Sequence, residues 1–185
     1  MQIILCRHGE TSWALLGKHT SFTDIPLTEK GEIQAREIHQ KMESLSYDLV
    51  YTSPYLRARK TCEIAQLPKP LIIEPNAVEW NYGDYEGLTT PEIWEKNPKW
   101  NLFRDGAPNG ESPDQVGKRA DLLINKWSSD GKNIVLFSHA HFLRVLAARW
   151  IGLPAGDAKL FVLSVGSISI LGFERTQKVI QAWNY

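Results

Sequence analysis

Two histidines follow short apolar runs that have the character of buried strands. Residues 3–6 run directly into Arg7 and His8, and residues 134–137 are followed, after one serine, by His139. Imidazole can act as a nucleophile or as an acid and base near neutral pH. Arg7 and His8 alone would be typical of a surface loop. Ligands of open α/β sheets, however, bind at the carboxyl ends of strands. Two such ends that each deliver a histidine therefore predict one shared site.

An arginine is spaced to join this site. A third strand is predicted over residues 48–52, and Ser53-Pro54 predicts the start of a helix, because serine caps helices and proline favours their first position. Arg57 would lie one turn into that helix and lean over its N-terminus. A helix N-terminus attracts anions, and a guanidinium adds a planar fork of donors. The residues together predict a phosphate site with a nucleophile beside it.

The elements that must position these residues alternate between strand and helix along the chain. Thr28 caps a predicted helix that runs to about residue 45, and Pro68 ends the helix that begins at Ser53-Pro54. Alternation of this kind predicts a mostly parallel sheet with helices on both faces. Further predictions are a loop over 13–27, a strand at 71–73, a short helix near 91–95, helices after Ser112-Pro113 and after His139, and C-terminal strands at 160–163, 167–173 and 178–183 that include an antiparallel hairpin.

Composition limits the class of protein. The 185 residues fit one domain, 43% are hydrophobic, and 21 basic residues balance 21 acidic ones. Zero net charge argues against a general nucleic-acid or membrane-surface binder. We see no signal peptide and no apolar run long enough to cross a membrane, so a cytoplasmic protein is expected. The two cysteines, Cys6 and Cys62, are expected to be buried free thiols in a reducing cytosol.

Six short motifs occur in order along the chain. They are Arg7-His8-Gly9-Glu10-Thr11, Leu27-Thr28 with Gly31, Ser53-Pro54-x-x-Arg57-Ala58-x-x-Thr61, Glu79-x-x-x-Gly83-x-x-Glu86-Gly87, Gly110-Glu111-Ser112 and Ser138-His139. Each motif alone is weak, but six in order are specific, and together they resemble the histidine phosphatase superfamily, also called the phosphoglycerate-mutase-like superfamily. The resemblance implies a three-layer α/β fold with a mostly parallel sheet and an antiparallel C-terminal edge.

The resemblance implies that His8 is a nucleophile that becomes phosphorylated. An imidazole attacks only when it is neutral, and Arg7 and Arg57 nearby would disfavour the imidazolium and neutralise the phosphoryl oxygens. His139 is then the second phosphate-contacting histidine. Phosphoryl transfer depends mostly on positioning and electrostatics, so this set is expected to work without a metal or another cofactor. His141 forms His-x-His with His139, but the pair is not expected to share a metal.

The same resemblance makes Glu79 the proton donor to the leaving oxygen and later the base for water. A working acid at neutral pH needs a raised pKa and therefore a sheltered pocket. Val78, Trp80 and Tyr82 are close enough in sequence to shelter it. Without the motif, Glu79 would be read as a solvated loop carboxylate. Tyr82 either hydrogen-bonds the substrate or packs.

Other positions match the family's phosphate contacts with substitutions. Thr20 and Ser21 align with a phosphate-contacting pair, in which Ser21 replaces the usual glycine but keeps its backbone donor. Ala140 replaces the glycine after the second histidine, and its N–H is expected to reach phosphate. Ala14 replaces an asparagine that contacts phosphate in mutases, which weakens a mutase interpretation.

The segment at about 80–111 is irregular and is expected to form a cap-like insert within the single domain 1–185. Trp80, Trp94 and Trp100 fall in it. They either cover the core or close over the end of the substrate that lacks the phosphate. In the second case, Arg104 would be a contact for a second phosphate.

Three functions are compared. The leading one is a metal-independent phosphatase that acts on a small phosphorylated metabolite. A mutase would carry a longer, more basic insert than the present one, which offers only Lys96, Lys99 and Arg104. An inactive phosphate-binding or adaptor protein would not need the full catalytic set. The stretches 17–28 and 137–144 look most like the fungal sedoheptulose-1,7-bisphosphatase branch, which suggests a sugar phosphate or bisphosphate. The oligomeric state stays open, with a homodimer as one option.

Overall fold

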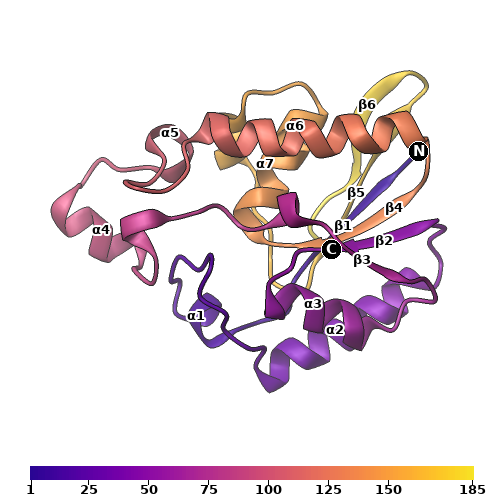
Figure 1. Cartoon of the computed structure of the whole chain (residues 1–185), viewed down its shortest axis with the longest axis horizontal. Coiled ribbons are helices and arrows are strands. Elements are labelled where there is room, and N and C mark those ends of the chain that lie inside the picture. The colour runs from indigo at the N-terminus through magenta and orange to yellow at the C-terminus, as the bar shows by residue number, and fades with distance from the viewer.

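The computed structural model describes all residues, 1–185, and its centre is a six-stranded sheet (Figure 1). Four strands are parallel to one another, and the last two are antiparallel to their neighbours. The predicted mostly parallel sheet with an antiparallel C-terminal edge is therefore confirmed. In spatial order the strands are β3 (Leu71–Ile73), β2 (Leu49–Thr52), β4 (Ile134–Ser138), β1 (Ile3–Arg7), β5 (Ile168–Glu174) and β6 (Gln177–Ala182).

Helices cover both faces of the sheet. Figure 1 shows α6 (Pro113–Asp130) and α7 (Ala140–Trp150) on one side, and α2 (Glu29–Met42) and α3 (Leu56–Ala65) on the other. The shorter elements are α1 (Ser12–Leu15), α4 (Thr90–Lys96), α5 (Leu102–Asp105) and the 3₁₀ turns η1 (Pro75–Ala77), η2 (Gly83–Tyr85) and η3 (Ala155–Leu160). No helix combines the length and apolar character that a bilayer crossing requires.

The two faces of the sheet have separate cores because side chains alternate along a strand. In β1, Ile3 and Leu5 belong to the large cluster under α6 and α7, whereas Ile4 and Cys6 belong to the smaller one under α2 and α3. Cys6 and Cys62 are both buried free thiols, as predicted. β1 is therefore covered on both faces, which explains why its sequence is apolar without alternation.

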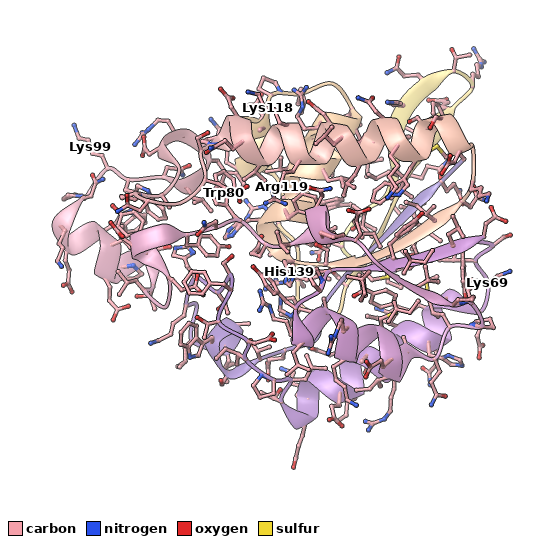
Figure 2. The ribbon with its side chains drawn as sticks, viewed as in Figure 1. Lys69, Trp80, Lys99, Lys118, Arg119 and His139 are labelled. Carbon is pink, nitrogen blue, oxygen red and sulfur yellow. The ribbon has the colours of Figure 1, made fainter.

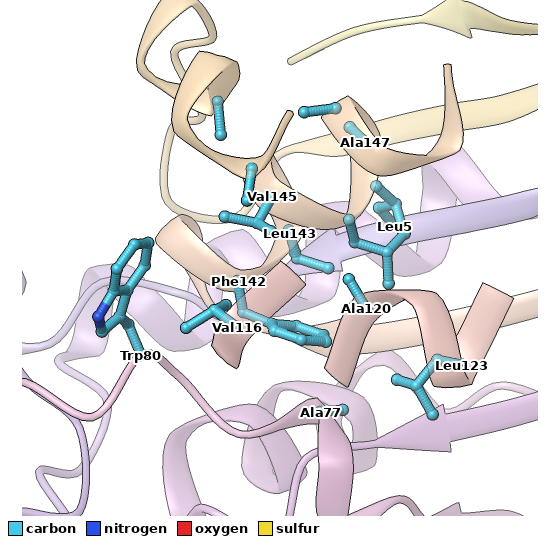
Figure 3. Packing of buried hydrophobic residues seen from close by; sticks show 14 of the residues in the cluster. Leu5, Ala77, Trp80, Val116, Ala120, Leu123, Phe142, Leu143, Val145 and Ala147 are labelled. Atoms are coloured by element: carbon cyan, nitrogen blue, oxygen red, sulfur yellow. The ribbon is translucent and has the colours of Figure 1, made fainter. Parts of the chain in front are cut away.

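The helix α6 is amphipathic, and its start is fixed by local chemistry. Ser112 accepts the amide of Gln115, whose side chain accepts the amide of Ser112, and Pro113 occupies the first helical position. The buried stripe packs on α7, as Figure 3 shows. Each large apolar side chain buried there contributes about 1.5–3 kcal/mol. The stripe consists of Val116, Ala120, Leu123, Ile124 and Trp127.

Three element predictions were wrong in part. The helix expected at Ser53-Pro54 begins only at Leu56, because the Ser53 hydroxyl accepts the Tyr55 amide and bonds to His139. The loop expected over 13–27 opens with α1, which Thr11 caps.

The third wrong prediction is the strand expected over residues 160–163, because this segment is not a strand. η3 ends at Leu160, and Leu160 and Val162 are 70% and 72% exposed. The segment is held by side chains and not by strand pairing: Trp183 Nε1 donates to the Val162 carbonyl at 2.7 Å, and the rings of Phe161 and Trp183 lie 5.2 Å apart. Arg7 donates to the Leu163 carbonyl, and Arg144 donates to the carbonyls of Ala158 and Lys159.

The segment 80–111 forms η2, α4 and α5 and extends to one side of the molecule (Figure 1). Trp80 and Trp100 are buried, and both belong to the same large cluster as α6. Their indole N–H groups donate to the backbone oxygens of Glu111 and Gly106. These two aromatics therefore cover the core, which is the first of the two roles considered for them.

Candidate functional site

The register of the sheet brings the two predicted histidines together. Arg7 of β1 lies opposite Ser138 of β4, and the His8 amide donates to the Ser138 carbonyl at 3.0 Å. The rings of His8 and His139 are 5.2 Å apart between centroids, and both residues are buried. Figure 2 shows His139 near the centre of the molecule, where β4 ends. The chain leaves β1 toward α2 and β4 toward α7, so the site lies where the sheet changes winding direction.

Glycine holds the turn after β1 against α2. A Cβ at Gly9 would lie 2.2 Å from the Gly31 oxygen, and one at Gly31 would lie 2.2 Å from the Glu10 oxygen. Gly9 does not have a positive φ, so it is needed for this backbone contact rather than for a turn. The Gly9 amide also donates to the Thr61 hydroxyl at 3.0 Å. The backbone beside His8 is therefore fixed from two helices.

A hydrogen bond assigns the nitrogens of the His8 imidazole, and His139 bonds to a hydroxyl. His8 Nδ1 lies 2.7 Å from the Gly9 carbonyl oxygen, which can only accept, so Nδ1 carries the proton and Nε2 the lone pair. His139 Nε2 lies 2.8 Å from Ser53 Oγ. When the Ser53 hydroxyl donates to Nε2, the unpaired Nδ1 of His139 carries the proton and can donate it to a hydrogen bond.

Both imidazoles are held neutral. Burial lowers the pKa of His8 well below its ordinary value, and the charges of Arg57 and Arg7 lower it further. Burial also lowers the pKa of His139 well below its usual range, with Arg57 and His8 adding to the effect. His8 can therefore keep a lone pair at neutral pH.

The two arginines use part of their guanidinium groups to hold backbone. Arg57 is only 1% exposed and donates from Nη2 to the carbonyls of Thr20 and Ser21 and from Nη1 to that of Thr23. Arg7 is partly buried and donates from Nη1 to Leu163. The Nε atoms of both arginines have no partner.

Unsatisfied donors converge on this site. Four buried side-chain polar atoms in the chain lack a hydrogen-bond partner, and three of them are Arg7 Nε, Arg57 Nε and His139 Nδ1. A buried donor without a partner costs about 1–3 kcal/mol. All three atoms belong to residues beside His8: Arg7 precedes it in the chain, the His139 ring lies 5.2 Å away, and Arg57 acts on it through its charge.

Glu79 is buried at the start of α7. Its carboxylate accepts the amides of Trp80 and Phe142 at 2.9 Å and of His141 at 3.1 Å. Arg119 donates to the carbonyls of Val78 and Glu79 and pairs with Glu111. The carboxylate is thus fixed by the helix N-terminus and by the backbone on its other side.

A cavity of about 370 Å³ opens at these residues. Of the predicted residues, it is lined by Arg7, His8, Thr20, Glu79, Tyr82 and Ala140. Arg57 and His139 do not reach its surface and lie buried next to His8.

Two predicted contacts are not brought to the cavity. The Ser21 amide, expected to face phosphate, donates to the Glu86 carboxylate at 2.9 Å. The Arg104 guanidinium, expected at a second phosphate, is largely exposed, is paired with Asp105 and donates to the Lys99 carbonyl. Each group is already engaged elsewhere.

The cavity includes basic residues that the sequence reasoning did not assign to the site. They are Arg144, Lys159 and Lys18. Arg144 stands four residues after Ala140 on α7, a spacing that places both on one helix face. That spacing was a usable signal for Arg144. Lys18 and Lys159 lie outside the motifs and carry no comparable signal.

A neutral group of aromatic and imidazole side chains forms another part of the wall. The Tyr82 hydroxyl lies 2.6 Å from His141 Nδ1, and the ring of His19 lies 4.8 Å from that of Tyr82. Burial lowers the pKa of His19 to about 4. Burial, with the charge of Arg144, also lowers the pKa of His141. His139 and His141 thus bond to separate partners, Ser53 and Tyr82.

The buried histidines predict loss of stability in mild acid. An unfolded histidine titrates near pH 6.5, whereas His8, His19, His139 and His141 titrate below that in the fold. Between these values the unfolded chain binds more protons than the folded chain. The contribution of these histidines to the free energy of unfolding is therefore fully present above about pH 6.5 and is lost as the pH drops. We expect a slope of about 1.4 kcal/mol per pH unit for each histidine. Urea unfolding in phosphate-free buffer from pH 7.5 to pH 5 measures it.

The control for this prediction is His19→Gln, which removes one of the four groups. Its slope should be shallower by about one proton, or roughly 1.4 kcal/mol per pH unit. An identical slope in the two proteins would show that burial of His19 does not cause the effect.

Comparisons with known proteins agree with this geometry. Residues 3–185 match the family model described as the histidine phosphatase superfamily, branch 1. An acid phosphatase of Mycobacterium tuberculosis is 40% identical over 179 residues, which cover 94% of this chain and 87% of that protein. A sedoheptulose 1,7-bisphosphatase of Saccharomyces cerevisiae is 36% identical over 182 residues, which cover 81% of this chain and 67% of that protein.

A solved structure shows the same architecture. The product of an open reading frame of Mycobacterium tuberculosis, 36% identical, superposes with a TM-score of 0.95 over 99% of this chain and 96% of that one. The family model spans nearly the whole chain, so the resemblance suggested by the six motifs is confirmed. The chain therefore belongs to the histidine phosphatase superfamily.

Proposed function

We propose that the protein is a metal-independent phosphatase of small phosphomonoesters that works through a phosphohistidine on His8. The observation that carries the proposal is that the neutral imidazole of His8 lies 5.2 Å from the ring of His139 and within the electrostatic reach of Arg57 and Arg7, three residues that each keep an unpaired buried nitrogen. A phosphoryl group offers the oxygens that these donors lack, and His8 Nε2 offers the lone pair.

In the first step, the His8 Nε2 lone pair forms a bond to phosphorus while the bond from phosphorus to the ester oxygen breaks. Arg7, Arg57 and His139 stabilise the charge on the three equatorial oxygens. Glu79, which lines the same cavity, gives a proton to the departing oxygen. The product alcohol then leaves, and His8 carries the phosphoryl group.

In the second step, water replaces the alcohol. Glu79 takes a proton from the water, the new oxygen–phosphorus bond forms, and the bond to His8 Nε2 breaks. Inorganic phosphate leaves, and Glu79 is again protonated. The cycle needs only side chains of this chain and water.

The substrate class is proposed to be a sugar phosphate or sugar bisphosphate in the cytoplasm. Support comes from the relative named sedoheptulose 1,7-bisphosphatase and from the size of the cavity, about 370 Å³, which suits a small metabolite. The relative named acid phosphatase supports the reaction class.

The mutase alternative is less well supported. We propose that residues 80–111 form a cap within a single domain. Of these residues, only Tyr82 and Thr90 line the cavity. The basic residues Lys96, Lys99 and Arg104 do not line it, so the insert offers no cation to retain the phosphate for return. Water is the better acceptor. An adaptor role is less well supported because the full catalytic set is present.

Release of phosphate from p-nitrophenyl phosphate and from a panel of sugar phosphates in EDTA tests the proposal. We expect turnover that EDTA does not reduce. Binding of phosphate without turnover would favour the adaptor function, and exchange between 2- and 3-phosphoglycerate would favour the mutase.

A further inference from the structure

Arg144 shares an unusual property with the two arginines of the phosphate site. Five arginines of the chain are not exposed, and two of them have carboxylate partners, Arg119 with Glu111 and Arg149 with Asp121. The other three, Arg7, Arg57 and Arg144, form no ion pair. A buried cation is costly without an anion. Arg7 and Arg57 lie beside His8, which leaves Arg144 to be explained.

The Arg144 guanidinium is fixed in place but not saturated. Its Nε donates to the Ala158 carbonyl at 3.2 Å and its Nη2 to the Lys159 carbonyl at 3.4 Å. Its carbon lies 4.4 Å from the centre of the Phe103 ring. Nη1 donates to no protein atom. Burial lowers the pKa of Arg144 to about 10, so the group remains a cation at neutral pH.

The charge of the cavity exceeds what one phosphoryl group neutralises. Four cations line it, Arg7, Arg144, Lys18 and Lys159, and its one acidic side chain is Glu79. A phosphomonoester carries about −1.5 to −2 at pH 7 and would be held by Arg7 with the buried Arg57. The remaining cations are then unbalanced, although the chain as a whole has zero net charge.

We propose that Arg144, with Lys18 and Lys159, forms a second phosphate subsite, so that the preferred substrate is a bisphosphate. The proposal rests on the proposed function, because His8 defines which phosphate reacts. The neutral wall of His19, Tyr82 and His141 lies in the same cavity and suits the hydroxyl groups of the carbon chain between the two phosphates. Arg144 takes the place that the sequence had suggested for Arg104.

The test compares fructose 1,6-bisphosphate with fructose 1-phosphate, which lacks only the distal phosphate. Each charge-assisted hydrogen bond is worth about tenfold or more. We expect kcat/KM to favour the bisphosphate by about tenfold or more in the natural protein. In Arg144→Gln, this ratio should fall at least about tenfold. 3-Phosphoglycerate is included to test a carboxylate as the second anion, and a preference for it over both fructose esters would overturn the assignment to phosphate.

Arg104→Gln is the matched control, because Arg104 is an exposed arginine outside the cavity, and its ratio should equal that of the natural protein. An unchanged ratio in Arg144→Gln, or an equal loss on both esters, would overturn the subsite. Calorimetric binding of the two esters to His8→Ala separates the subsite from the chemistry. If His8→Ala binds the bisphosphate more tightly than the monophosphate, and Arg144→Gln removes that preference, the subsite is supported even when no protein shows turnover. If His8→Ala shows no such preference, the subsite is wrong, and the proposed reaction at His8 is unaffected.

Discussion

His8→Ala is expected to reduce kcat for p-nitrophenyl phosphate by roughly 10⁴-fold or more, because loss of a nucleophile typically costs about 10⁴–10⁶. In the proposed mechanism the Nε2 lone pair attacks phosphorus, and the hydrogen bond from Nδ1 to the Gly9 carbonyl fixes that lone pair on Nε2. Without it, Arg7, Arg57 and His139 still form a phosphate site but have nothing to transfer the group to. Rapid acid-free quenching with ³²P-labelled substrate should detect a phosphoenzyme in the natural protein and none in the variant.

The control for this prediction is His39→Ala, which removes a histidine of α2 that bonds to the Ala65 carbonyl, away from the cavity. The phosphoenzyme of the natural protein and of this control should be labile in acid and stable in base, as a phosphorus–nitrogen bond is. A label that resists acid, or substantial activity left in His8→Ala, would rule out His8 as the phosphoryl acceptor.

Glu79→Gln is expected to lower turnover of a sugar phosphate by about 10²–10⁴, the usual contribution of a general acid or base. The loss should depend on the leaving group. An alkoxide needs a proton as it departs, whereas p-nitrophenolate needs much less help. With p-nitrophenyl phosphate we therefore expect a burst of one p-nitrophenol per site, followed by slow hydrolysis of the phosphoenzyme. Stopped-flow absorbance measures both phases.

The Glu79→Gln prediction needs two controls. The Glu79 carboxylate accepts three amides, including two at the start of α7, so thermal unfolding must show that Glu79→Gln is folded. Glu92→Gln, which alters an exposed carboxylate of α4, should behave like the natural protein. A loss that is equal for good and poor leaving groups, with no burst, would mean that Glu79 positions α7 and does not transfer a proton.

The sequence was most informative where a motif coincides with a strand end. Arg7 and His8 follow one buried strand and His139 another, and parallel neighbours deliver their carboxyl ends to the same edge. Arg7 pairs with Ser138 in the sheet, and His8 and His139 are the residues that follow them, so the two imidazoles lie close together. Periodicity predicted that both strands exist, but their adjacency in the sheet had to come from the fold.

Two errors in the site have a common physical origin. Arg104 and Ser21 have the residue type or alignment of a phosphate contact, but Asp105 and Glu86 already bind them. Competition of this kind depends on which partners the tertiary structure brings within hydrogen-bond distance. For Ser21 the local sequence contains no such information, because Glu86 is 65 residues away. For Arg104 the partner is the next residue, Asp105, and only the fold shows that the paired guanidinium lies outside the cavity.

By itself, the sequence determined the family and the α/β architecture, and it predicted Arg7, His8, Arg57, Glu79 and His139 as the central residues, because these inferences depend on local patterns and motif order. Only the tertiary structure decided which nitrogens remain unpaired and which cations face the cavity. Hydrogen-bond pairing and burial are set by residues distant in sequence. For that reason, the end of the cavity that contains Arg7 and His8 could be predicted from the sequence, whereas the end that contains Arg144 had to be found in the fold.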